Sequence, residues 1–251
     1  MKPYKFLFLC GVIIALGTAL TAQAAIITYS GLDNGAGAGD ARPNSDAAAA
    51  SFDAAVGSHG LITFEGLAVG NFNSPVTVAT GVTVTLTNTA FNTADDAYAG
   101  IANVNATALG YNTTAVGQNH LRVVPQFDGN DVSVTFDFAS PINFFGAYLT
   151  GTENGINGSF KLNFNDGSDQ SLTLPENNTG GGVEFYGFTD FGAGISSVTF
   201  NEVGPFDPKR DIWGIDDVRY GSTPVPEPAT MLLVGSGLIG LAGYARKRFK
   251  K

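Results

Sequence analysis

Two stretches of the chain, Val132–Phe138 and Phe160–Asn165, alternate apolar and polar residues without a fault. A period of two puts one face of a strand on a core and the other in water, which is typical of antiparallel sheets. Shorter runs rich in apolar and β-branched residues, separated by turn residues, predict further strands. These are Leu61–Phe64, Val76–Ala79, Val82–Thr87, Leu121–Val124, Ile142–Thr150, Gln170–Leu174, Val183–Phe188, Ile195–Phe200 and Ile212–Tyr220. The spacing predicts an all-β protein, an antiparallel two-sheet sandwich of the jelly-roll type.

One segment has helical rather than strand character. Residues Ala47–Val56 are alanine-rich, Ser45 is a suitable N-cap, and Gly57 can take the position after the last turn. The stretches Gly35–Asp40 and Ala90–Asn119 have little periodicity and are expected to be long loops. We therefore expect one short N-terminal helix beside the sandwich.

The N-terminus has the layout of a secretory signal peptide. A basic start is followed by the apolar run Phe6–Leu20 and by Ala22-Gln23-Ala24, a small-residue cleavage site. Cleavage after Ala24 would remove Cys10, which is the single cysteine of the chain. We therefore expect an exported domain without a disulfide.

The C-terminus has three ordered parts: Val225–Pro228, the apolar run Ala229–Tyr244, and a basic tail at 245–251. As a helix the apolar run would be roughly 24 Å long, short of the ~30 Å hydrocarbon core of a bilayer. Cations at its end resist crossing the membrane and hold that end in the cytoplasm. We expect a marginal transmembrane helix at 229–244, suited to insertion and later removal.

This order of parts resembles the PEP-CTERM sorting signal of Gram-negative bacteria, also known as an ice-binding-protein C-terminal motif. Pro226, Glu227 and Pro228 match its namesake tripeptide, and glycines punctuate the apolar run as in such tails. The resemblance implies processing by an exosortase, which is a membrane cysteine transpeptidase, and delivery to the cell surface or extracellular matrix. An ordinary tail anchor with a proline-rich stem is the alternative.

Four regions follow from these patterns. They are a signal peptide at 1–24, an N-terminal segment with the helix at 25–60, the β-sandwich at 61–221, and the sorting signal at 222–251.

All 22 acidic residues of the chain fall between Asp33 and Glu227. Such an acidic surface repels phosphate backbones, so we expect no nucleic-acid partner, and it attracts divalent cations.

The sequence offers little catalytic chemistry. It has two histidines and contains neither H-E-x-x-H nor G-x-S-x-G nor a phosphate-binding loop. A glycosidase needs only two carboxylates at the right separation, and nothing in the sequence singles out such a pair. We expect a protein that is not an enzyme.

Two acidic segments stand at opposite ends of the predicted sandwich, Phe64-Glu65-Gly66 and Ile215-Asp216-Asp217-Val218. The first and last strands of a jelly roll are usually neighbours, so these carboxylates are expected to converge. The segments resemble those that hold a structural calcium ion in jelly-roll carbohydrate-binding modules. The resemblance implies that Glu65 with Asp216 or Asp217 would supply oxygen ligands, completed by backbone carbonyls. The alternative is that Glu65 and one Asp are exposed while the other pairs with Arg210 or Arg219.

Glycan binding needs exposed aromatic side chains, and the candidates are Trp213, Tyr148, Tyr186 and Tyr98. A lone Trp in a sandwich is more often part of the core, which is the alternative for Trp213.

Three function classes remain. The first is a non-catalytic surface or matrix protein associated with exopolysaccharide, the second is a carbohydrate-binding module for that matrix, and the third is a secreted polysaccharide-active enzyme.

Overall fold

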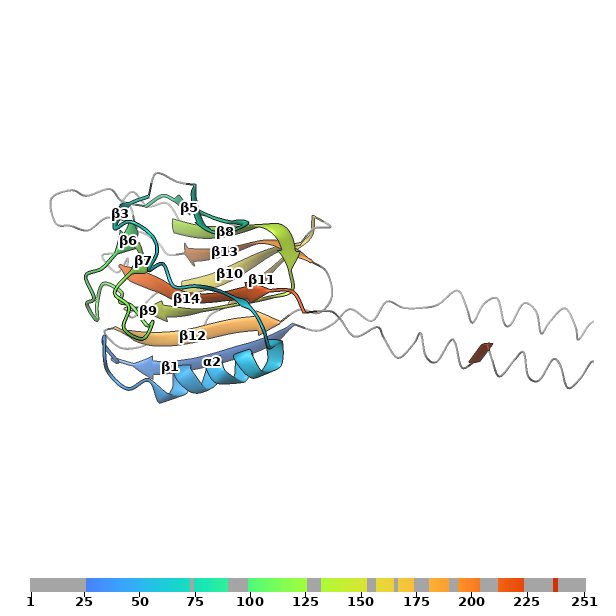
Figure 1. Cartoon of the computed structure of the whole chain (residues 1–251), viewed down its shortest axis with the longest axis horizontal. Coiled ribbons are helices and arrows are strands. Elements are labelled where there is room, and N and C mark those ends of the chain that lie inside the picture. Colours follow the sequence, from blue (N-terminus) through green and yellow to red (C-terminus); the bar gives the residue numbers. More distant parts are fainter. Residues whose placement is uncertain are drawn as a thin grey trace, which may run out of the picture.

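The computed structural model describes residues 26–72, 75–89, 99–125, 132–152, 157–164, 167–173, 181–189, 194–203, 212–223 and 237–238. In these residues two antiparallel β-sheets face each other, and one helix, α2 (Pro43–Val56), lies against the outside of the larger sheet (Figure 1).

The larger sheet has its strands in the order β1-β12-β9-β14-β7-β6-β3, with β2 also paired to β14. Their bounds are β1 (Ile27–Asn34), β12 (Gly182–Thr189), β9 (Phe144–Thr150), β14 (Trp213–Gly221), β7 (His120–Val123), β6 (Gly100–Ala102), β3 (Gly70–Asn71) and β2 (Gly60–Ile62). The smaller sheet has the order β11-β10-β13-β8-β5-β4. Its strands are β11 (Asp169–Thr173), β10 (Asn157–Phe164), β13 (Ile195–Val203), β8 (Val132–Ile142), β5 (Val82–Thr87) and β4 (Val76–Ala79).

The main core lies between the two sheets and follows the alternation of the sequence. In β8, Val132, Val134 and Phe136 are buried while the residues between them are partly exposed, as predicted. Phe136 meets Phe145 of the facing sheet with ring centroids 5.4 Å apart. This arrangement confirms an antiparallel two-sheet sandwich with its main core between the sheets.

Most predicted strands are confirmed, and β2 lies beside β14, so the first and last strands of the predicted body are neighbours. The predicted boundary at 61 is wrong, because β1 pairs with β12 along its whole length and belongs to the larger sheet. Strands β3 and β6 were not predicted. Such short strands hold too few residues to show a period of two.

Helix α2 begins two residues before the predicted N-cap. Its first helical residue is Pro43, which suits that position because a proline there loses no hydrogen bond. The cap comes from β1: one oxygen of Asp33 accepts the Asn44 N–H at 3.1 Å, and the other accepts the Ser45 N–H at 2.8 Å. Burial opposes ionisation of Asp33, but these hydrogen bonds outweigh it and lower the pKa of the carboxyl group.

The helix covers part of the outer face of the larger sheet with aromatic contacts. Phe52 is fully buried and lies 5.6 Å from the ring of Tyr29, 6.0 Å from Phe144 and 5.6 Å from Phe185. A second, smaller core thus forms outside the sandwich, between α2 and strands β1, β9 and β12. The helix therefore covers a face of the sheet.

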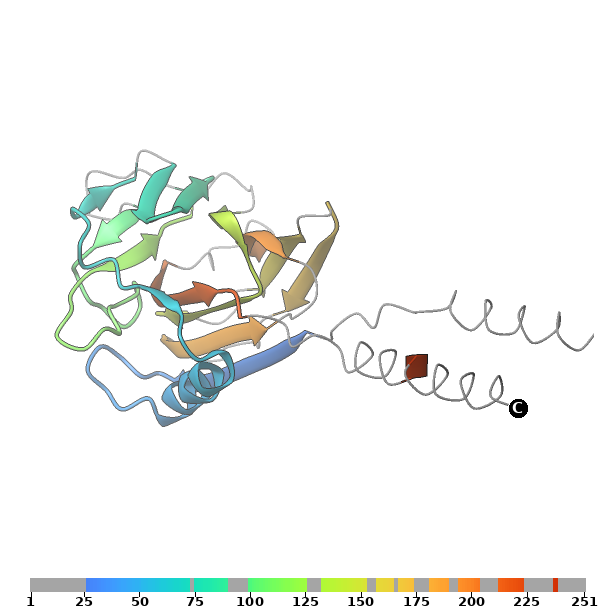
Figure 2. The same cartoon turned by 45° about the vertical axis from the view of Figure 1, so that its right-hand side comes forward.

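The strand register defines two ends of the domain. Ile27, Thr189, Phe144 and Gly221 are cross-strand neighbours at one end, which we call the tail end. Asn34, Gly182, Thr150 and Gly214 lie at the opposite end, which we call the loop end. The first and last residues of the described domain thus leave from the same end, as Figure 2 shows.

The predicted signal peptide lies outside the described residues, as do the basic tail and all of the predicted membrane helix except Gly237 and Leu238. Among the residues that the structure describes, no helix is both long enough and apolar enough to span a bilayer.

Candidate functional site

Residues 105–119, which we call the covering loop, lie over the outer face of the larger sheet at β14 and the end of β9. Gly110 lies directly on Gly214 of β14 with positive φ, and a Cβ atom at Gly110 would collide with the Gly214 backbone. Both backbone groups of Tyr111 bond to the Thr150 hydroxyl at 2.9 Å, since the Tyr111 N–H donates to it and the Tyr111 carbonyl accepts from it. The loop therefore lies flat against the sheet at the loop end.

Glu65 fastens the far part of the covering loop. Its Oε1 atom accepts hydrogen bonds from the side chain of Asn112 at 2.7 Å and from the backbone N–H groups of Gln118 and Asn119, both at 2.9 Å. Gly117 leaves the space for this approach, because a Cβ atom there would overlap the carboxylate. Glu65 is an exposed residue.

Asp216 and Asp217 fasten the middle of the same loop. Asp216 Oδ2 accepts from the Thr113 N–H at 2.6 Å and from the Thr114 N–H at 3.2 Å. The Thr113 hydroxyl donates to Asp217 Oδ2 at 2.9 Å, and the Thr114 hydroxyl donates to Asp217 Oδ1 at 2.7 Å. The loop N–H groups have no partner in a sheet, and these buried carboxylates satisfy them.

Unusual backbone geometry presents both acidic segments. Phe64, which precedes Glu65, has φ of 58°, and Asp217 has φ of 47°. The register between β14 and β9 shifts between Asp216 and Arg219, so a β-bulge allows two consecutive aspartates to face the loop. Positive φ is uncommon outside glycine and is often found where a side chain must be aimed.

Burial changes the acidity of the groups beneath the loop. Desolvation, helped by the neighbouring charge of Asp217, raises the pKa of Asp216 to about 7, although the hydrogen bonds of Thr113 oppose the rise. Nearby, burial and the charge of Arg122 lower the pKa of His120 to about 4. Asp216 Oδ1 is buried and has no hydrogen-bond partner in the described structure.

The structure brings Glu65, Asp216 and Asp217 to one loop but does not assemble them into a shared ligand set. Among the described residues, no three His, Cys, Asp or Glu side chains gather closely enough to hold a metal ion. The alternative also needs correction: Arg219 forms its ion pair with Asp53 at 2.9 Å and donates to the carbonyl oxygen of Asp217 at 2.8 Å. Arg210 lies outside the described residues.

The aromatic residues considered for glycan stacking are buried. Trp213 is 0 % exposed and packs on Phe200 at 4.3 Å between ring centroids, while Tyr148 and Tyr186 are each 4 % exposed. A stacking platform must present a ring face to solvent, so the prediction that these rings contact a glycan is wrong for a stacking role. Tyr98 lies outside the described residues.

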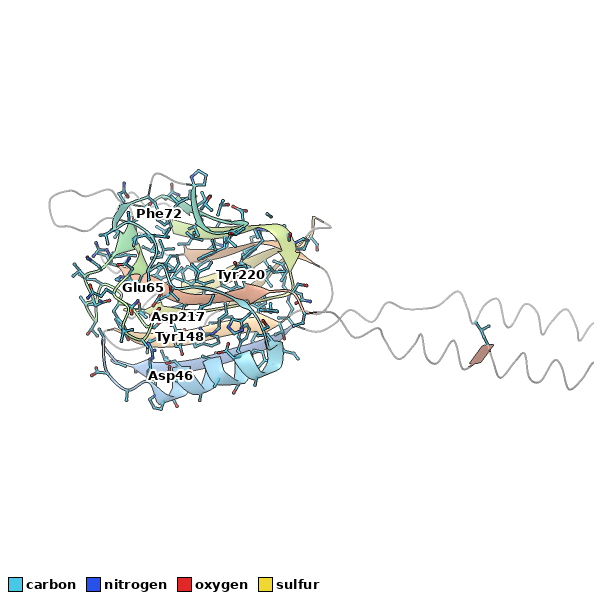
Figure 3. The ribbon with its side chains drawn as sticks, viewed as in Figure 1. Asp46, Glu65, Phe72, Tyr148, Asp217 and Tyr220 are labelled. Atoms are coloured by element: carbon cyan, nitrogen blue, oxygen red, sulfur yellow. The ribbon has the colours of Figure 1, made fainter. Side chains whose placement is uncertain are left out.

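A polar pocket of about 340 Å³ at the loop end was not predicted. It lies where the β1–α2 connection, the first turn of α2 and the covering loop meet, and its charged residues are Asp40, Arg42 and Asp46. Asp46 lies near Tyr148 in Figure 3, and the Tyr148 hydroxyl donates to it at 2.8 Å. A sequence signal existed: the only arginine before residue 122 stands between two acids, just after a glycine-rich loop.

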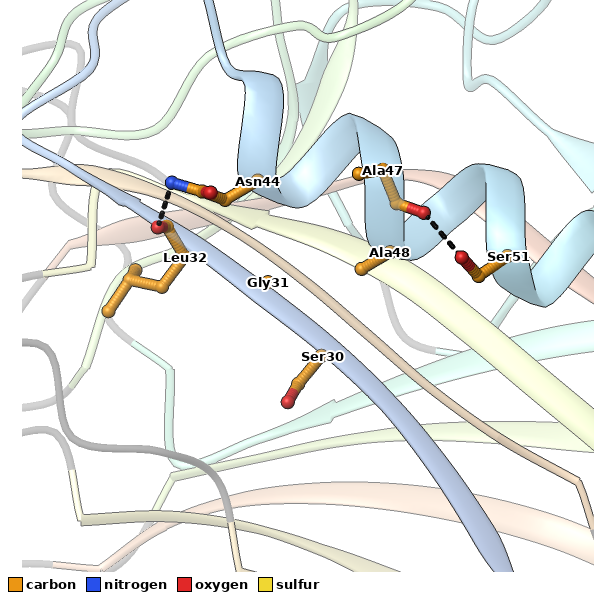
Figure 4. Close-up of a pocket in the computed structure, with 7 residues that line it drawn as sticks. All are labelled: Ser30, Gly31, Leu32, Asn44, Ala47, Ala48 and Ser51. Atoms are coloured by element: carbon orange, nitrogen blue, oxygen red, sulfur yellow. Dashed lines mark hydrogen bonds between the residues drawn. The ribbon is translucent and has the colours of Figure 1, made fainter.

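A second hollow, of about 490 Å³, runs between β1 and α2 (Figure 4). Gly31, Ala47 and Ala48 give it small walls, and the side chain of Asn44 spans it to the Leu32 carbonyl at 3.3 Å. Gly31 has no room for a Cβ atom against the Asn44 carbonyl. Its polar lining residues are Ser30, Asn44 and Ser51, and none of the described residues that line it is charged. The hollow is explained by the close packing of the helix on its strand.

Comparison with known proteins adds one family finding, at the C-terminus. A search among curated proteins found no match. A solved structure described as the C-terminal domain of a chitobiase from Bacteroides fragilis aligns at 11% sequence identity, covering 59% of this chain and 97% of that chain, with a TM-score of 0.34. A likeness at this level supports no statement about function. Residues 224–248 match the PEP-CTERM protein-sorting motif, which confirms the expectation for Pro226, Glu227 and Pro228 and implies export and processing by an exosortase.

Proposed function

We propose that the chain is an exported cell-surface or extracellular-matrix protein, sorted by an exosortase, whose β-sandwich is not catalytic. The observation that carries the proposal is the sorting motif at 224–248 together with the common tail end of the domain. Because both ends of the domain's chain leave at the tail end, the loop end lies on the side of the domain opposite the sorting signal. Strand β14 has nine residues, so the loop end stands about 27 Å away along the strand direction.

This geometry supports a presenting role. While the sorting signal is anchored, the tail end faces the membrane and the loop end faces outward. Asn143 fixes the exit of the chain, because its side chain donates to the Thr223 carbonyl at 2.8 Å and accepts the Thr223 N–H at 3.0 Å. Its backbone N–H also donates to the Gly221 carbonyl at 2.9 Å. The jelly-roll assignment belongs to this proposal and is supported by the pairing of β2 with β14.

Mass spectrometry of the protein recovered from culture medium and from cell fractions tests the proposal. We expect a mature N-terminus at Ala25 and loss of the residues that follow the Pro-Glu-Pro motif, in material associated with the surface, the exopolysaccharide or the medium. Recovery of the intact chain from the cytosol, with both Met1 and Lys251, would contradict it.

A carbohydrate-binding module that recognises matrix polysaccharide is the second candidate. The polar pocket favours it, because carboxylate and guanidinium groups converge at the end of the domain that faces outward. A pull-down with the polysaccharide matrix of the producing cells separates this candidate from a purely structural or adhesive role.

A secreted polysaccharide-active enzyme is the third candidate, and the structure favours it least. Asp216 and Glu184 have the raised pKa values, about 7 and about 8, that a general acid needs. However, Asp216 is 0 % and Glu184 is 3 % exposed, and a catalytic carboxyl group must reach the substrate. Reducing-sugar release from matrix polymers would revive this candidate.

We keep a structural calcium ion in the proposal, with Asp216 rather than a shared set of carboxylates as its side-chain ligand. Asp216 Oδ1 is a buried oxygen without a hydrogen-bond partner in the described structure, and it is the atom that a cation would neutralise. Backbone carbonyls would have to supply most of the six to eight oxygens that calcium prefers. A cation bound at this atom would stabilise the covering loop in addition to the loop's hydrogen bonds.

A further inference from the structure

The polar pocket at the loop end is rigid before any ligand arrives. Arg42 is held on three sides: its Nε donates to Asp46 at 2.9 Å, its Nη2 donates to the Thr113 carbonyl at 2.7 Å, and its guanidinium lies 4.8 Å from the centre of the Tyr148 ring. The Tyr111 hydroxyl donates to the Ala36 carbonyl at 2.6 Å and so ties the covering loop to the β1–α2 connection. A site that is already ordered loses little conformational entropy on binding.

The same residues keep polar atoms for a ligand. Asp46 takes both of its bonds on Oδ1, and Asp40 takes the Gly37 N–H on Oδ2 at 2.9 Å. In the described part of the chain, Asp40 Oδ1, Asp46 Oδ2 and Arg42 Nη1 form no hydrogen bond. The pocket thus presents two acceptors and one donor around a single cavity of about 340 Å³.

We propose that this pocket binds one neutral sugar residue, with Asp40 and Asp46 accepting hydrogen bonds from its hydroxyl groups and Arg42 donating one. The proposal rests on the exported, surface-presented role argued above and adds the ligand class and the site. Neighbouring hydroxyl groups of a sugar both donate and accept, which fits carboxylates beside a guanidinium. Two carboxylates against one guanidinium leave a net negative charge, which disfavours phosphates and acidic sugars.

Size and chemistry also limit the affinity. The cavity lies at the small end of the range of ligand pockets, roughly 300–1,000 Å³, so it suits one ring rather than a chain of rings. Tyr111 lines the pocket but is only 1 % exposed, and the ring of Tyr148 beside it is covered by Arg42, so ring stacking adds little. Hydrogen bonds that replace bonds to water give weak binding, and we expect a Kd of about 1 mM for a single sugar. Many copies on a surface would then hold a polymer by multivalency.

The test uses the full chain in a detergent without a sugar headgroup. Saturation-transfer NMR is recorded with the methyl glycosides of glucose, galactose, mannose and N-acetylglucosamine. The variants are Asp40→Asn and Asp46→Asn, which keep the shape of the side chain and an acceptor oxygen for its internal bonds, and Arg42→Lys. Ser51→Ala is the matched control, because Ser51 lies on α2 outside this pocket and, among the described residues, its hydroxyl bonds to the Ala47 carbonyl alone. Thermal melts show that each variant is folded.

We expect at least one glycoside to bind, at least tenfold weaker binding in Asp46→Asn and in Arg42→Lys, and unchanged binding in Ser51→Ala. Binding that stays within twofold of the wild type in all three pocket variants would overturn the site, and so would the absence of binding by all four glycosides. Neither result touches the exported role, which the mature termini of the secreted protein report separately. Conversely, cytosolic, uncut protein that still binds sugar through Arg42 would overturn the exported role and leave the sugar site in place.

Discussion

The outer face of the larger sheet is covered in two different ways, and the difference explains the candidate site. Helix α2 covers β1, β12 and β9 with apolar and aromatic side chains around Phe52. The covering loop lies over β14 and is held by polar contacts to Asp216 and Asp217 of that strand and to Glu65. Within a helix most backbone groups bond to one another, so α2 needs an outside acceptor only at its first turn, from Asp33, whereas a loop needs outside acceptors along its length. The carboxylates of Asp216 and Asp217, which are buried, and of Glu65, which is exposed, are those acceptors.

The largest effect should come from removing the apolar cover. Phe52→Ala deletes a ring that contacts Tyr29, Phe144 and Phe185, and a buried Phe→Ala change costs about 3–5 kcal/mol. Urea unfolding should show this loss. A loss below about 1 kcal/mol would mean that the helix is only loosely attached. Ser51→Ala on the exposed side of the same helix is the control.

The polar cover should be weaker but still measurable. Asp216→Ala leaves the N–H groups of Thr113 and Thr114 without their acceptor, and one orphaned buried donor costs about 1–3 kcal/mol. Because the loop can partly open to water, we expect a total loss of about 2–3 kcal/mol in urea unfolding. A variant as stable as the wild type would show that the carboxylate is not needed to hold the loop.

The two covers should also differ in their response to pH. The pKa of Asp216 is raised from 3.8 to about 7 in the folded protein, so the folded state holds a proton that the unfolded state has lost. The contribution of Asp216 to stability therefore falls as pH rises from about 4 to about 7. His120, lowered from 6.5 to about 4, acts in the opposite direction below pH 6.5.

Above pH 6.5 the effect of Asp216 is separated from that of His120. Between pH 6.5 and 8 we expect the wild type to lose about 1 kcal/mol through Asp216, since one pKa unit corresponds to about 1.4 kcal/mol. Glu184, raised from 4.5 to about 8, adds a loss of the same sign. The difference between the wild type and Asp216→Asn isolates the loop, and parallel pH profiles for the two proteins would contradict the assignment.

Chelation should have the smallest effect. If calcium neutralises Asp216 Oδ1, excess EDTA should lower the melting temperature of the full chain by a few degrees, about 1 kcal/mol. The effect should disappear in Asp216→Asn and persist in Asp40→Asn, whose carboxylate lies outside the covering-loop contacts. An unchanged melt in the wild type would remove calcium from the account.

The sequence predicted the parts of the fold that depend on periodicity. The alternation in β8 was recognised because one face of that strand packs in the core, and the apolar run of β9 was recognised because both of its faces are buried. Strand β1 was missed, because its sequence mixes Gly31, Ser30 and Asp33 into a strand that packs under a helix. The N-cap was also missed, since its acceptor is Asp33, from outside the helix.

The site was harder to predict than the fold. The convergence of Glu65 with Asp216 and Asp217 followed from strand order, but their partners did not, because the covering loop has no periodicity to place it. Carboxylates that suit a calcium ion suit backbone N–H groups equally well, and composition does not separate the two. The polar pocket depends on Arg42 meeting Thr113, a contact between residues far apart in the chain.

Hydrogen exchange measured on the covering loop tests the central claim most directly. The claim is that Glu65, Asp216 and Asp217 hold this loop as hydrogen-bond acceptors. The account predicts faster exchange of the Thr113 and Thr114 amides in Asp216→Ala, faster exchange of the Gln118 and Asn119 amides in Glu65→Ala, and unchanged protection of β9 and α2 in both. Loop amides that exchange at wild-type rates in both variants would contradict it.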